Sequence, residues 1–151
     1  MTEPAYLVVG WSRAPDGRLR LAFYTPTSST PGKEVEKALN SKCVSIHVVM
    51  LDTDKDFMEQ EETYVQTHSR LFERARSVWP SVDGGTTVCD IEGAVPRPEE
   101  VGEKHNETLY VENFDKKGST TPREDVERAL RAGSTRVFVS KRLVTTPPEF
   151  L

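Results

Sequence analysis

Apolar positions along the chain predict six strands and three helices. Between Lys55 and Trp79 the apolar residues recur every three or four positions, which predicts one long helix with a buried face. Shorter runs that are alternately or continuously apolar predict strands, and two short amphipathic segments predict the other helices. The strands are expected at residues 5–11, 18–24, 43–51, 86–91, 108–114 and 135–144.

The two short helices share one sequence pattern. Residues 28–39 read SSTPGKEVEKAL, and residues 119–130 read STTPREDVERAL. A threonine precedes a proline in each segment, so we expect the side chains of Thr30 and Thr121 to cap the helices. Glu124 is expected to complete a capping box with Thr121. An internal duplication and the convergence of two helices on the same capping residues both explain the match.

The order of these elements predicts an α+β fold. It reads ββαβ, then the long helix, then ββαβ again, and the length suits a single domain over residues 1–151. We expect a mixed six-stranded sheet with its helices mainly on one face, because a crossover helix should make the second and third strands parallel. If the chain is duplicated, the repeats span residues 5–51 and 86–144, linked by helix 55–79. A doubly wound α/β sheet is the alternative.

The composition is that of a folded globular protein. Hydrophobic residues make up 36% of the chain and charged residues 29%, which excludes a disordered chain. The net charge of -4 argues against nucleic acid as a partner. No apolar run reaches transmembrane length and no signal peptide pattern is present, so we expect a cytoplasmic protein without a membrane partner. Cys43 and Cys89 are too few for a disulfide framework, and we expect both as buried free thiols.

Three aspartates follow the most continuously apolar strand. Asp52, Asp54 and Asp56 alternate with other residues at the point where the long helix begins. Carboxylates at the end of a central strand are suited to hold Mg²⁺ or Mn²⁺, which prefer oxygen ligands. A helix N-terminus rich in acid is the simpler interpretation, because the macrodipole favours negative charge there. We therefore expect that the protein has no cofactor, and the alternative is a site for Mg²⁺ or Mn²⁺ at these aspartates.

A second candidate group interrupts the apolar stripe of the long helix. Glu61 and His68 lie two helical turns apart, with Tyr64 between them, and His47 lies in the central strand. A buried histidine with a carboxylate is a plausible acid–base set, so His68, Glu61 and His47 are the candidate catalytic residues. The simpler interpretation places the two histidines in the core and the glutamate at a wet edge.

A third candidate is an anion site before the second short helix. The segment combines unpaired N–H groups of a helix start with hydroxyl groups and cations, which together suit a phosphate. The candidate ligand-binding residues are Lys116, Lys117, Ser119, Thr120 and Arg123. Ordinary helix capping is the simpler interpretation.

These patterns favour binding over catalysis. No nucleophile motif, paired metal motif or dinucleotide fingerprint is present. We expect a non-enzymatic protein that recognises a protein partner or small ligand through a groove between two halves. A homodimer is one form that this protein could take. The alternative is a small metal-dependent phosphoryl-transfer or hydrolytic enzyme that uses Asp52 and Asp54.

Overall fold

A computed structural model describes residues 4–74, 87–96, 109–113 and 118–143 of the chain. Strands and helices are mixed along the sequence, which confirms the expected α+β class. The elements are β1 (Tyr6–Arg13), β2 (Leu19–Ser28), α1 (Pro31–Asn40), β3 (Cys43–Met50), α2 (Phe57–Arg74), β4 (Thr87–Pro96), β5 (Leu109–Asn113), α3 (Pro122–Arg131) and β6 (Arg136–Leu143).

The strands form one sheet in which every pair of neighbours is antiparallel. Their order is β2-β1-β3-β6-β4-β5. The expectation of a mixed sheet is therefore wrong, and so is the doubly wound alternative. The crossover through α1 does join two strands of the same direction, because β2 and β3 are each antiparallel to β1. Since β1 lies between them, these two strands never become neighbours.

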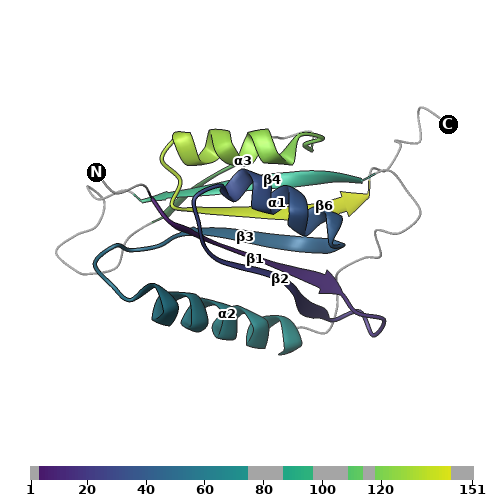
Figure 1. The fold of residues 1–151 in the computed structure, drawn as a ribbon. Coiled ribbons are helices and arrows are strands. Elements are labelled where there is room, and N and C mark those ends of the chain that lie inside the picture. The colour runs from purple at the N-terminus through teal and green to yellow at the C-terminus, as the bar shows by residue number, and fades with distance from the viewer. Residues whose placement is uncertain (1–3, 75–86, 97–108, 114–117, 144–151) are drawn as a thin grey trace.

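The helices cover both faces of the sheet. α1 and α3 lie side by side on one face, and α2 lies on the opposite face (Figure 1). The expectation that the helices pack mainly on one face is therefore wrong. Because successive side chains of a strand point to opposite faces, the central strands supply two separate cores. The core beneath α1 and α3 includes Val8, Val35, Ile46, Val126, Val137 and Val139, and the core beneath α2 includes Leu7, Val9, Trp11, Leu19, Val49 and Leu51.

Serine side chains, and not threonine side chains, stabilise the starts of α1 and α3. Thr30 and Thr121 occupy the N-cap positions, but neither side chain forms a capping hydrogen bond, so that expectation is wrong. Instead, the N–H of Thr30 donates to Ser28 Oγ and the N–H of Thr121 donates to Ser119 Oγ, each at 3.0 Å. The second bond occupies the backbone group that a capping box with Glu124 requires. Each serine thus closes a short turn that leads the chain into its helix.

The two ββαβ segments have the same topology. Read inward from either edge, the sheet presents the second, first and third strands of one segment. His47 and Phe138 are cross-strand partners in the central β3–β6 pair, and the sequence interval between them equals that between Thr30 and Thr121. The backbone angles of these threonines are also close, at φ -128° and ψ 63° against φ -127° and ψ 61°. His47 and Phe138 therefore occupy corresponding positions at the centre of the sheet.

α1 and α3 run antiparallel and approach closely at Gly32. A Cβ atom on this glycine would lie 2.5 Å from Glu127 Oε1, so a larger residue forces a shift. Further along the pair, Arg123 Nη1 lies 4.0 Å from a carboxylate oxygen of Glu36. Gly32 corresponds to Arg123 in the shared pattern, and Glu36 corresponds to Glu127. The helix pair thus makes corresponding contacts in both directions.

The long helix begins slightly later than expected. α2 starts at Phe57, because the side chain of Asp56 accepts the N–H of Glu59 at 3.0 Å and so caps the first turn. The expected helix ran to Trp79, and its last residues, 75–79, lie outside the described part of the chain. Among the helices that the structure describes, none combines the length and the apolar character needed to cross a membrane.

Candidate functional site

Two histidines, a tyrosine and a phenylalanine meet where α2 passes the centre of the sheet. The Tyr64 hydroxyl on α2 lies 2.8 Å from Nδ1 of the buried His47 on β3. The ring centroid of His47 lies 5.2 Å from that of His68 on α2 and 4.9 Å from that of Phe138 on β6. We call these four residues the histidine cluster. The structure therefore brings together the two histidines that the sequence suggested.

The histidine cluster is held rigidly by its own contacts. His68 Nδ1 lies 2.9 Å from the main-chain carbonyl of Tyr64, and since a carbonyl only accepts, Nδ1 carries a proton. The His68 ring also stacks on the Tyr64 ring at 3.9 Å between centroids. Trp11 packs edge-on against His47 at 4.9 Å, and its indole N–H donates to Ser69 Oγ at 3.2 Å. In neutral His68 the acceptor nitrogen is therefore Nε2.

Burial suppresses the acid–base chemistry of His47 and Tyr64. It lowers the pKa of His47 to about 3, with smaller contributions from the nearby charges of His68 and Arg136. Burial also raises the pKa of the Tyr64 hydroxyl well above its usual value. At neutral pH His47 is therefore uncharged and a weak base, while Tyr64 is a weak acid. Neither group is suited to move a proton in a reaction near pH 7.

Glu61 does not join the histidines. Its buried carboxylate accepts a hydrogen bond from Thr27 Oγ1 at 2.9 Å and one from the Tyr24 hydroxyl at 3.3 Å. Both donors lie on β2, whereas His47 lies on β3. Glu61 and His68 lie on one stripe of α2, yet Glu61 contacts β2 and His68 lies against His47 of β3. The carboxylate therefore anchors α2 to the edge of the sheet.

Charged side chains of β4 and β6 lie next to the histidine cluster. The Arg136 guanidinium lies 5.8 Å from the centre of the Tyr64 ring, within reach of a cation–π interaction. Further along β6, Arg142 Nε donates to both carboxylate oxygens of Asp90 on β4, at 2.9 and 3.1 Å. Glu92 is exposed and lies opposite Phe138 in the ladder. We call Tyr64, His68, Asp90, Glu92, Arg136 and Arg142 the junction surface.

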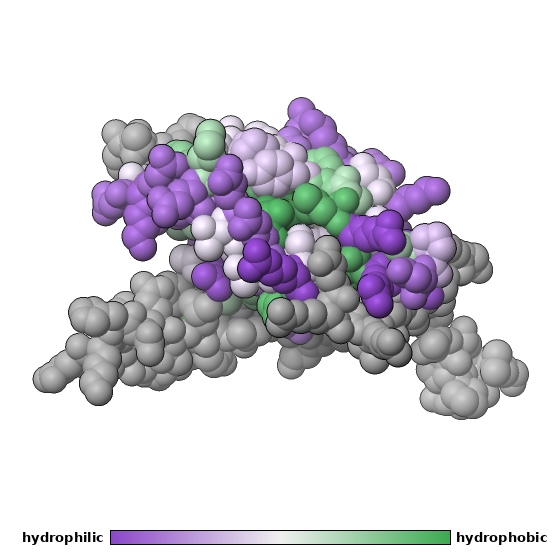
Figure 2. All heavy atoms as spheres, turned by 90° about the horizontal axis from the view of Figure 1, so that it is seen from below, coloured by the Kyte–Doolittle hydropathy of each residue, from purple (hydrophilic) through white to green (hydrophobic). Residues whose placement is uncertain are grey.

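The junction surface was missed in the sequence, although a signal for part of it exists. Asp90 and Glu92 alternate with apolar residues along β4, and Arg136 lies two positions before Phe138 along β6, so each set lies on one face of its strand. Such alternation usually marks a solvated sheet face. On this face the described residues place no helix over β4 and β5, whereas α2 lies beneath β1 and β2 (Figure 1). Figure 2, seen from the α2 side, shows apolar side chains gathered near the middle with hydrophilic ones around them.

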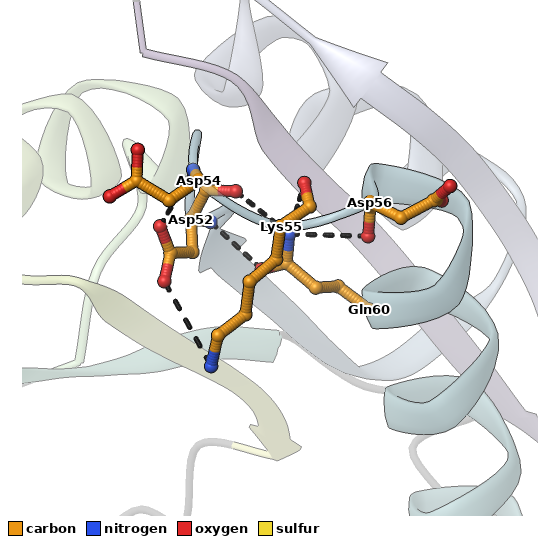
Figure 3. A network of polar contacts seen from close by, with 5 residues as sticks. All are labelled: Asp52, Asp54, Lys55, Asp56 and Gln60. Atoms are coloured by element: carbon orange, nitrogen blue, oxygen red, sulfur yellow. Dashed lines mark hydrogen bonds and ion pairs between the residues drawn. The ribbon is translucent and has the colours of Figure 1, made fainter.

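The three aspartates form a capped loop. Asp52 accepts the N–H of Asp54 at 2.9 Å and lies 4.0 Å from Lys55 Nζ, while Gln60 bonds both main-chain polar groups of Asp52. The carboxylates of Asp54 and Asp56 lie on opposite sides of this loop (Figure 3). Across the described ranges, no group of three histidine, cysteine or acidic residues is arranged to hold a metal. Helix capping accounts for the contacts of Asp52 and Asp56 without a metal.

The candidate anion site is only partly described. Lys116 and Lys117 lie outside the described residues. Ser119 is buried, and its hydroxyl donates to the carboxylate of the buried Asp125. Thr120 is exposed, and the remaining cation, Arg123, faces Glu36 and Glu127. A negative side chain therefore already occupies the partner position that an anion would need at Ser119.

Both cysteines are buried and free, as expected. Burial raises the pKa of the Cys43 thiol and of the Cys89 thiol to about 11 each, although Lys141 lies close to both and acts in the opposite direction. The thiolate is the reactive form of cysteine. At neutral pH both side chains are therefore protonated core residues and not nucleophiles.

Comparisons of the chain with protein-family models, with curated proteins and with solved structures find no match.

Proposed function

We propose that the chain is a non-enzymatic binding protein that recognises a partner protein through the junction surface. One observation carries the proposal: the half-buried aromatic rings of Tyr64 and His68 lie beside charged side chains of both signs. Aromatic residues and arginine are enriched among the residues that contribute most to protein interfaces. A small ligand on the same surface is the second form of this proposal.

The arrangement of polar groups favours binding over catalysis. A catalytic histidine needs a pKa near the working pH, and burial moves that of His47 far below it. The carboxylate that would orient a histidine, Glu61, bonds to β2 instead. What remains at the cluster is a rigid and mostly apolar platform. Rigid aromatic groups lose little conformational entropy on binding, which suits recognition.

We further propose that the chain arose by duplication of a ββαβ unit, with repeats at residues 5–51 and 86–144. The shared helix pattern, the strand order and the central pair of His47 and Phe138 support this proposal. The junction surface would then lie between two halves, of which the first is covered by α2. On the α2 face the first half presents Leu7, Val9 and Trp11, and the second half presents Asp90 and Glu92. This difference in polarity leaves the second half suited to an exposed, partner-facing role.

The test compares the proteins that bind to the wild-type chain and to the double variant Glu92→Ala/Arg136→Ala. Both side chains are exposed, so the variant should fold normally. We expect a cellular protein that the wild type retains to be lost with the variant. With purified components, its affinity for the variant should be at least about tenfold weaker, the equivalent of about 1.4 kcal/mol.

The matched control for this test is Lys33→Ala, which removes an exposed charge from α1 on the opposite side of the sheet. This control should retain the same partner with unchanged affinity. If the wild type, the double variant and the control retain the same proteins equally well, the junction surface is not the binding site. Light scattering of the purified proteins tests for a homodimer. If the wild type is a dimer and the double variant is a monomer, the partner is a second copy of the chain.

The enzyme alternative is separated by metal titration. On the binding proposal, millimolar Mg²⁺ or Mn²⁺ should leave the melting temperature of the wild type unchanged. Stabilisation by metal that disappears in Asp52→Ala would instead favour the metal-dependent enzyme, because a ligand that binds the folded state raises its stability.

A further inference from the structure

A second surface lies at the opposite edge of the sheet from β5. β2 is the edge strand, and no described segment pairs with its outer side. Pro26 lacks an N–H and Thr27 has a positive φ of 51°, so the regular edge ends before them. The stretch from Leu19 to Tyr24 therefore presents main-chain polar groups, with one irregularity in its register against β1 between Leu21 and Phe23. We call this stretch the open edge.

A hollow runs along the open edge. It has a volume of about 510 Å³ and is lined by Arg18, Leu19, Arg20, Leu21 and Ser69. Leu19 belongs to the core beneath α2, and Leu21 pairs with Trp11 of that core, so the hollow lies on the face of the sheet that α2 covers. Ser69 belongs to α2 and lines the hollow as well. The hollow therefore adjoins the open edge where β2 meets α2.

The side chains of the open edge are partly apolar. Leu21 is 47% exposed and Tyr24 is 42% exposed, which places them among the few large apolar side chains that the described surface presents. Natural edge strands are usually protected by charges or prolines against unwanted pairing. Here Arg18 and Arg20 lie on one side of the strand and Leu21 on the other. The two arginines thus disfavour pairing with a basic strand and favour pairing with an acidic one.

Pairing of β2 with β2 of a second copy is unfavourable in registers that bring the arginines together. In an antiparallel pair centred on Leu19, Arg18 of each copy would lie opposite Arg20 of the other. Like charges in opposed strands are destabilising. An extended segment with carboxylates at alternate positions would instead place them beside Arg18 and Arg20. Its intervening apolar side chains would lie on the side of Leu21.

We propose that the open edge of β2 binds an extended acidic segment of a partner protein, which adds to the sheet as a further strand. Main-chain hydrogen bonds supply the affinity in this mode, and alternate side chains supply the selectivity. Arg20 is the cation best placed to exchange partners, because its present contact with Asp16 is long, at 3.8 Å, and solvent-exposed. This surface is separate from the junction surface, so either proposal can fail alone.

The probe is a short synthetic peptide in which glutamate alternates with valine. Its binding to the full-length chain is measured by fluorescence anisotropy and by amide hydrogen exchange. We expect exchange to slow at residues 19–24. The double variant Arg18→Glu/Arg20→Glu should weaken the affinity by about tenfold or more, because attraction becomes repulsion at two positions. The control Lys33→Glu makes the same kind of charge reversal on α1 and should change the affinity less than about twofold.

Two further peptides test the strand pairing itself. N-methylation of every residue removes the main-chain donors on both edges of the peptide and should abolish binding, and replacement of glutamate by lysine should do the same. The proposal is overturned if the acidic peptide does not bind, if either altered peptide binds equally well, or if Lys33→Glu weakens binding as much as the arginine variant. The proposal is also overturned if the peptide slows amide exchange at residues outside β2. The same holds if the wild type is a dimer and the variant Arg18→Glu/Arg20→Glu is a monomer.

Discussion

The burial of His47, whose Nδ1 pairs with the Tyr64 hydroxyl, makes the stability of the fold depend on pH. The perturbation that tests this is the pair of variants Tyr64→Phe and His47→Phe/Tyr64→Phe. The first removes the hydroxyl that pairs with His47 Nδ1 and leaves a buried ring nitrogen without its partner. An unpaired buried polar group costs about 1–3 kcal/mol of folding free energy. The second removes both partners and places at position 47 the residue found at its counterpart, Phe138, so it should cost much less.

The pH dependence follows from the pKa of His47, which burial lowers from 6.5 to about 3. As the pH falls below about 6.5, the unfolded chain takes up this proton before the folded chain does, so protonation favours unfolding. The stabilising neutral form is fully present above that pH and is lost progressively down to about pH 3. Between about pH 7.5 and about pH 4, the wild type should therefore lose about 3 kcal/mol through this group.

Urea unfolding followed by circular dichroism measures both effects. The carboxylates also titrate over this range, but they are the same in the wild type and in His47→Phe/Tyr64→Phe, so the difference between the two isolates His47. We expect the double variant to lose about 3 kcal/mol less than the wild type on acidification. Equal losses would refute the reasoning, and so would a Tyr64→Phe variant as stable as the wild type near neutral pH.

The remaining predictions concern the turns that precede α1 and α3 and the contact between these two helices. Ser119→Ala should lower the unfolding free energy by about 1–3 kcal/mol and Ser28→Ala by about 1 kcal/mol or less, because Ser119 also serves a buried carboxylate; thermal and urea unfolding would rank them, and the reverse order would contradict the account. Gly32→Ala should be near neutral in the wild type but stabilising by about 0.5–1 kcal/mol in a Glu127→Ala background, since the clash is then gone. A double-mutant cycle without such coupling would show that Glu127 moves freely aside.

Much of the fold could be predicted from the sequence because its elements are locally encoded. The periodicity of α2 and the apolar run of β3 placed both correctly, and proline placed the starts of α1 and α3. Strand order was different. The insertion of β1 between β2 and β3 depends on pairing between distant residues, which no local pattern records, so the expected parallel neighbours were wrong. Ser28 and Ser119 lie two residues before the N-cap, and the sequence pattern pointed instead to the N-cap threonines.

The candidate site was predictable only in part. His47 and His68 could be paired because an apolar strand and a helical stripe both point to one core. Glu61 shares the stripe of His68, yet it meets β2, because the strand that lies beneath each turn of a helix depends on tertiary packing, which the stripe does not record. Arg136 lies in a strand that the sequence predicted, whereas Glu92 was expected in a loop after the strand at residues 86–91, which in the structure continues to Pro96. Their place beside Tyr64 and Phe138 became visible only with the register of β6 against its neighbours.

The central pairing of β3 with β6 has a consequence for how the chain reaches its native state. Every other ladder of the sheet joins strands of one ββαβ segment, and this ladder alone joins strands from different segments. Contacts between residues far apart in sequence carry the largest loop-closure entropy and slow the search for the native topology. The ladders within each segment can thus form independently at a lower entropic cost. We therefore expect the pairing of β3 with β6, with His47 and Phe138 at its middle, to be the slowest step of folding.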